Sequence, residues 1–117
     1  MNSDTIVAVA TAPGPAGVGV LRLSGPQALD VVEPLFLATD GRSLARASAR
    51  CLTLGLLSRL SGEPLDEVLA VYFPAPHSFT GDLVVEIQAH GGSFHLSEIQ
   101  AALLESAGRR GLDLRLA

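Results

Sequence analysis

The sequence has little of what builds covalent frameworks or membrane anchors. Cys51 is its only cysteine, so the chain can form neither an internal disulfide nor a cysteine-based metal cluster. No apolar run approaches the ~20 residues that span a bilayer. The first residues, 1–4, also lack the basic start of a signal peptide. We therefore expect a cytoplasmic protein that makes no membrane contact.

Charge is scarce as well. Charged residues make up 17% of the chain, against about 25% in an average soluble domain, and the net charge is −4. Nucleic-acid binding by this chain alone is disfavoured, because phosphate contacts need a basic surface. Hydrophobic residues reach 48%. That excess indicates either an apolar surface for a partner or ligand, or a simple bias of composition toward leucine, alanine and valine.

The 117 residues suit one domain, which we place at 1–117. Strand patterns occupy residues 5–11, 18–23, 50–58, 66–73 and 83–89, and helical patterns occupy about 25–37 and 93–107. This order predicts an α+β fold with a mixed β-sheet of about five strands and two to three helices. Residues 112–117 alternate like one more strand, so we expect the natural chain to continue beyond them.

Local signals refine these elements. The first strand is apolar and β-branched, which predicts burial on both of its faces. Ser24 and Gln27 have the spacing of a capping box at the start of the first helix, and Pro34 should kink that helix or end it early. Gly108 is expected just beyond the end of the second helix.

The glycine-rich stretches do not make a catalytic centre. Residues 14–19 lack the Lys-Ser/Thr of a phosphate loop, and no helix pattern opens there, so a tight turn is favoured and GTP hydrolysis by this chain is not expected. Residues 90–92 resemble an oxyanion loop only superficially. His77, His90 and His95 lack the spacing and the further ligands of a metal site. We assign no catalytic residue and no metal.

Two charged residues interrupt apolar strands, namely Arg22 and Glu86. An unpaired charge is costly to bury, so each lies either on a solvated face or in a groove whose ligand needs one cation and one anion.

Two long segments then resemble a known family. Residues 4–25 read DTIVAVATAPGPAGVGVLRLSG, and residues 75–92 read APHSFTGDLVVEIQAHGG. Both, with residues 65–69 between them, resemble the N-terminal domain of the MnmE (TrmE) family of tRNA uridine-34 modification GTPases. The resemblance covers essentially the whole chain.

This resemblance implies a folate-binding fold related to the glycine-cleavage T-protein group. It implies homodimerisation, and binding of a 5-formyl-tetrahydrofolate-type one-carbon carrier near the dimer interface. By match of motif, Arg22 and Glu86 fall on folate-contacting positions, and a further contact falls beyond Ala117. GTP, Mg²⁺ and K⁺ would belong to a GTPase domain that this chain lacks. In the full-length protein, which would hydrolyse GTP, the flavoprotein MnmG and tRNA are the implied partners.

Two rival functions are considered beside the folate-binding one. The first is a structural dimerisation domain with a vestigial folate pocket. The second is a stand-alone folate-dependent aminomethyltransferase, for which the chain is too short.

Overall fold

A computed structural model describes residues 4–10, 18–76, 78, 81–90 and 93–117, and the fold is given for those residues. The strands are β1 (Ile6–Val9), β2 (Val18–Ser24), β3 (Phe36–Ala38), β4 (Thr53–Ser58), β5 (Pro64–Phe73), β6 (Val84–His90) and β7 (Arg115–Leu116). The helices are α1 (Ala28–Val32) and α2 (Ser93–Arg109), with short 3₁₀ turns η1 (Glu33–Leu35) and η2 (Leu44–Arg46). The glycine turn predicted at residues 14–19 falls largely on residues 11–17, which lie outside the described residues, and so does His77.

The strands form one mixed sheet in the order β3-β4-β5-β6-β2-β1-β7. Neighbouring strands are antiparallel, except that β7 runs parallel to β1. The α+β prediction is confirmed, and the described residues hold seven strands where about five were expected. One of the two further strands, β7, lies within residues 112–117, whose alternation predicted one more strand. The other, β3, is three residues long, which is too short to give an alternating pattern of its own.

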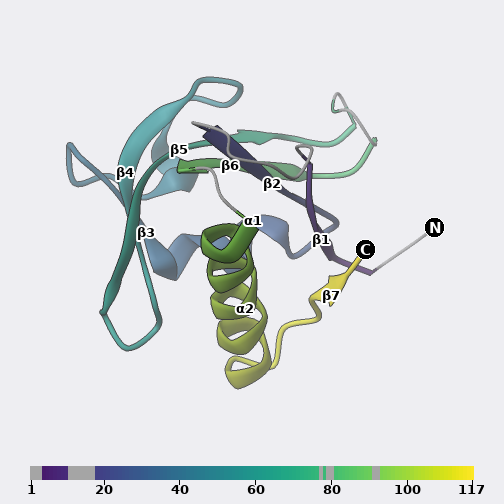
Figure 1. The fold of residues 1–117 in the computed structure, drawn as a ribbon. Helices are drawn as coiled ribbons and strands as arrows, with labels where there is room; N and C mark the ends of the chain where they lie inside the picture. The colour runs from purple at the N-terminus through teal and green to yellow at the C-terminus, as the bar shows by residue number, and fades with distance from the viewer. Residues whose placement is uncertain (1–3, 11–17, 77, 79–80, 91–92) are drawn as a thin grey trace.

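Both helices lie against one face of the sheet, with α2 running below β6, β2 and β1 (Figure 1). Alternation sets the inward side of each central strand: Leu21 and Leu23 of β2, and Val85 and Ile87 of β6, are buried in the core. The opposite face, called the open face below, has no helix over it among the described residues (Figure 1). The described helices include none that is long and apolar enough to cross a lipid bilayer.

The open face explains one wrong prediction. In β1 only Val7 is buried, whereas Ile6 and Val9 are exposed. The apolar composition of this strand suggested burial on both faces. Ile6 is exposed because no described helix covers the open face, whereas Val9 shares the face of Val7 by alternation and is exposed at the end of the strand.

The first helix is shorter than predicted. It ends at Val32, η1 follows with Pro34 in its first turn, and Phe36 already pairs with Leu57 of β4. Pro34 cannot donate to a carbonyl in the preceding turn, so early termination at this proline is confirmed. The last carbonyls of α1 instead accept hydrogen bonds from Arg110, whose Nη1 donates to Asp30 (2.8 Å) and Nη2 to Val31 (2.7 Å).

The predicted capping box is wrong. Gln27 precedes α1, and no side chain caps the helix there. The side-chain Oε1 of Gln27 instead accepts a hydrogen bond from the backbone N–H of Asp113. The backbone N–H of Gln27 donates to Oγ1 of Thr5. These long-range bonds tie the start of α1 to Thr5, just before β1, and to the segment before β7, and they use the groups that a local cap would have needed.

Gly108 is also misplaced as the residue that follows α2. The helix continues to Arg109, and Gly111 takes the left-handed conformation at φ 71°. The N–H of Leu112 donates to Ala107, and that of Gly111 to Gly108, which is the Schellman pattern of a helix end.

Candidate functional site

Arg22 and Glu86 face each other across β2 and β6 on the open face. The Nε and Nη2 atoms of Arg22 lie 2.9 and 2.6 Å from Oε1 of Glu86. Both side chains are partly buried, with 31% of Arg22 and 18% of Glu86 exposed. The structure therefore brings the two predicted site residues together as an ion pair at the sheet surface.

The pair leaves acceptor capacity on the carboxylate. Both arginine bonds fall on Oε1, and no donor from the described part of the chain reaches Oε2 of Glu86. An ionised carboxylate accepts on both oxygens, so Glu86 keeps a position for a ligand N–H. By register, Val71 of β5 lies beside Glu86, and Ala8 of β1 lies beside Arg22. The charges thus stand on an otherwise apolar part of the open face, where a flat apolar ligand loses little hydration by approaching.

A hollow of about 230 Å³ opens further along β6 and β5. It is lined by Leu54, Glu67, Val68, Leu69, Gln88, Ala89 and His90. Gln88 is two residues from Glu86, so strand alternation places both side chains on the open face. The hollow and the ion pair are therefore neighbouring parts of one surface.

Asp66 closes the end of the β5–β6 ladder with its side chain. Its Oδ2 accepts the backbone N–H of His90 (3.0 Å), and its Oδ1 lies 2.7 Å from Nδ1 of the His90 ring. The buried Nε2 of His95, in the first turns of α2, lies 3.2 Å from Oδ2 without hydrogen-bond geometry. One carboxylate thus contacts the end of β6 and the start of α2.

The charge state of Asp66 follows from these contacts. Burial acts to raise the pKa of the Asp66 carboxyl, but the hydrogen bonds from the His90 backbone and ring, together with the nearby His95 ring, outweigh it. The net pKa lies below the ordinary value, so the group is ionised at neutral pH.

Sequence reasoning missed this carboxylate. His90 and His95 were considered with His77, and the acidic residues nearest to them on the same elements, Glu86 on β6 and Glu98 on α2, pair with arginines instead. Asp66 is 24 residues from His90 and is brought beside it only by the pairing of β5 with β6. Within the described residues, no group of three histidine, cysteine, aspartate or glutamate side chains is arranged so that it could hold a metal ion.

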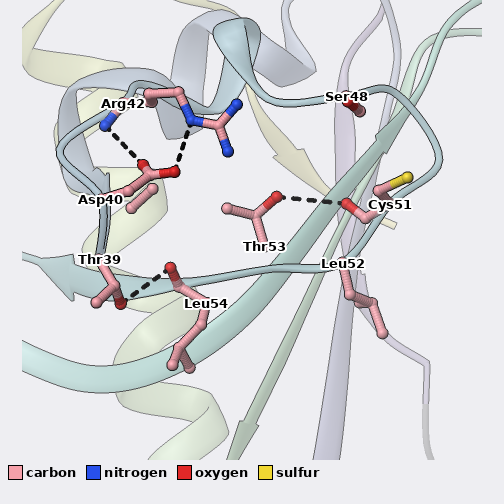
Figure 2. A pocket seen from close by; sticks show the side chains of 9 residues that line it. Thr39, Asp40, Arg42, Ser48, Cys51, Leu52, Thr53 and Leu54 are labelled. Carbon is pink, nitrogen blue, oxygen red and sulfur yellow. Dashed lines mark hydrogen bonds and ion pairs between the residues drawn. The ribbon is translucent and has the colours of Figure 1, made fainter.

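A larger pocket of about 420 Å³ lies at the β3–β4 end of the sheet, beside Cys51 (Figure 2). Figure 2 shows the Arg42–Asp40 ion pair on one side and Cys51 on the other. The Oγ1 atoms of Thr39 and Thr53 donate to backbone carbonyls of the pocket wall (3.2 and 3.4 Å). Its polar groups are bonded to one another or exposed, so this pocket carries no assigned function.

Comparison with known proteins decides the family. The family described as "GTP-binding protein TrmE N-terminus" matches residues 5–117. The chain belongs to the TrmE N-terminal family. The matched range includes Arg22, Asp66, Glu86 and His90, and the family resemblance stated from the two long motifs is confirmed.

Three relatives show the extent of this similarity. The chain is 42% identical over 110 residues to the "tRNA modification GTPase MnmE" of Moorella thermoacetica, which is 93% of this chain and 24% of the relative. Over 114 residues it is 40% identical to the protein of the same name from Clostridioides difficile (97% and 23%). Over 116 residues it is 45% identical to that of Acidovorax sp. (99% and 23%). The TrmE N-terminal domain described here thus spans about a quarter of these relatives' length.

Proposed function

We propose that this domain binds a 5-formyl-tetrahydrofolate-type one-carbon carrier for a tRNA modification GTPase, with Arg22 and Glu86 as contacts. The observation that carries the proposal is the ion pair itself. It places an oriented guanidinium and a carboxylate with a remaining acceptor on an apolar sheet face. The relatives named tRNA modification GTPases supply the context for such a ligand.

The residue types suit a reduced pterin. Its 2-amino group and the adjacent ring N–H form a donor pair that a carboxylate accepts side by side, which suits Glu86. The planar guanidinium of Arg22 suits a carbonyl or carboxylate oxygen of the ligand, and its bond to Glu86 keeps it in place before binding. The residues present therefore fit the carrier, which would supply the one-carbon unit.

Further parts of the proposal concern the longer protein. GTP, Mg²⁺ and K⁺ are assigned to its GTPase domain, and MnmG and tRNA to the assembled complex. The single, exposed cysteine supports a reducing, cytoplasmic setting. Homodimerisation is assigned to this domain, supported by the exposed leucines Leu37, Leu54 and Leu56 of β3 and β4.

Calorimetric titration of 5-formyl-tetrahydrofolate into the 117-residue chain tests the ligand. We expect saturable binding, weakened about 10- to 150-fold in Glu86→Gln and in Arg22→Ala. Glu63→Gln is the matched control, because Glu63 also pairs with an arginine, Arg59, but on the exposed β4–β5 turn. Circular dichroism checks that each variant is folded.

Two outcomes would favour the rival function, a dimerisation domain with a vestigial pocket. One is the absence of binding both to this chain and to the longer protein that includes residues beyond Ala117. The other is equal binding by wild type and both folded site variants. One observation fits this rival: the charges of Arg22 and Glu86 already pair with each other without a ligand.

A further inference from the structure

His90 continues the row of side chains that begins at Glu86. Residues 86, 88 and 90 alternate along β6, and His90 lines the same hollow as Gln88, Leu54 and Leu69. Four residues of strand cover roughly 13 Å, so one extended ligand can contact both ends of this row.

The His90 ring is both exposed and fixed. Its side chain is 73% exposed, whereas that of Asp66, which holds it, is only 10% exposed. An exposed ion pair contributes little to stability, and ordering an exposed ring costs side-chain entropy. Here the anchor is a nearly buried carboxylate that the His90 backbone also holds. This arrangement fixes the ring while its far side faces solvent.

The same contact fixes the tautomer of His90. An ionised carboxylate is an acceptor only, so Nδ1 carries the proton that it shares with Asp66. In the neutral ring Nε2 is then an acceptor, and no described residue donates to it. In its neutral form His90 therefore presents a hydrogen-bond acceptor of fixed position at the rim of a hollow that leucines, Glu67 and Gln88 line.

We propose that His90, oriented by Asp66, is a further ligand-binding residue, and that its Nε2 accepts a hydrogen bond from an N–H of the bound carrier. This inference rests on the proposed function. A folate-type ligand has an aryl ring and an amide N–H beyond its pterin. The aryl part suits the leucine-lined hollow, and the amide N–H is the donor that His90 requires. Asp66 is a positioning residue, because it acts only through the ring that it holds.

The test uses 5-formyl-tetrahydrofolate with His90→Asn, Asp66→Asn and the control Asp40→Asn. His90→Asn keeps an N–H near the place of Nδ1 for Asp66 and removes Nε2. We expect a loss of affinity of about 5- to 10-fold in His90→Asn and a similar loss in Asp66→Asn. The double variant should lose no more than His90→Asn alone, since both changes remove one contact. Asp40→Asn makes the same chemical change at an exposed pair far along the sheet and should bind like wild type.

A spectroscopic readout separates ligand contact from a structural role. Long-range ¹H–¹⁵N NMR spectra should show the Nδ1–H tautomer of His90 in the free protein and a shift of its Nε2 resonance on saturation. If wild type binds, Glu86→Gln weakens binding, and yet His90→Asn binds normally or Nε2 does not move, this inference is wrong and the proposed function stands. If the wild type fails to bind even in the longer protein, both the proposed function and this inference are wrong. Should Asp66→Asn not fold, His90→Asn and the NMR shift still decide the question.

Discussion

The carboxylate of Asp66 accepts two hydrogen bonds from one residue, His90, through its backbone N–H and its ring. Because these bonds favour the ionised form, Asp66 has a lower pKa in the folded protein than in the unfolded chain. The contribution to stability is therefore fully present above the unfolded pKa of about 3.9 and is lost as pH falls through the folded pKa.

The acid dependence gives the first prediction. At neutral pH, Asp66→Asn should lower the free energy of unfolding by about 1–3 kcal/mol, because partly buried donors lose a charged acceptor. Urea unfolding at a series of pH values should show the two proteins converging only as pH falls below the folded pKa of Asp66, which lies under its ordinary value, where the carboxyl is protonated. A stability difference that stays constant from neutral to acidic pH would show that the charge of Asp66 is not the cause.

Gly55 and Gly108 give a matched pair for the second prediction. A Cβ on Gly55 would lie 2.5 Å from the carbonyl oxygen of Leu37 and 2.5 Å from the ring of Phe36. The Leu37 carbonyl lies between paired strands, so it cannot move away without distorting the sheet. Gly55→Ala should therefore destabilise the protein by about 1–3 kcal/mol.

The control change is Gly108→Ala. The added methyl would meet nothing within 4 Å, and the residue lies within α2. Alanine should stabilise the helix there by about 0.5–1 kcal/mol. Urea midpoints of both variants check the pair, and the same sign of change in both would contradict the packing argument.

Adjacent arginines at the end of α2 give the third prediction. Arg110 donates to two carbonyls at the end of α1 and to Ser106, whereas the exposed Arg109 pairs, among the described residues, with Glu105 alone. Arg110→Ala should cost about 1–3 kcal/mol, since the last turn of α1 loses its donors. Arg109→Ala should stay within about 0.5 kcal/mol of wild type in the same thermal or urea assay. Equal effects would mean that the α1 contacts contribute nothing.

The sequence predicted the central elements because their signals are local. The strand pattern over residues 83–89 predicted β6, and Pro34 predicted the early end of α1. The errors arise where distant partners act. Gln27 bonds to Asp113 rather than to a local cap, and Asp66 reaches His90 only through strand pairing. Arg22 and Glu86 were chosen individually, and only the register of β2 against β6 shows that they form a pair.

The last prediction concerns self-association through the leucines of the outer strands. Leu37 of β3 lies beside Leu56 of β4 by register. Leu54 is two residues before Leu56 on β4, so its side chain lies on the same face. These side chains are 58%, 45% and 44% exposed, so three large apolar groups stand together on the open face away from the helices. An exposed apolar cluster favours a partner, and a second copy of the chain can present the same patch across a two-fold axis.

Sedimentation at a series of concentrations tests this patch directly. The wild-type chain should associate, and Leu54→Ser combined with Leu56→Ser should shift it toward monomer with little loss of stability, because these side chains are already largely exposed. Leu60→Ser is the matched control, since Leu60 is a similarly exposed leucine on the β4–β5 turn, outside the patch. If wild type is monomeric at the highest concentration, the patch does not join copies of this chain. If Leu60→Ser dissociates the protein as well as the double variant does, another surface holds the copies together.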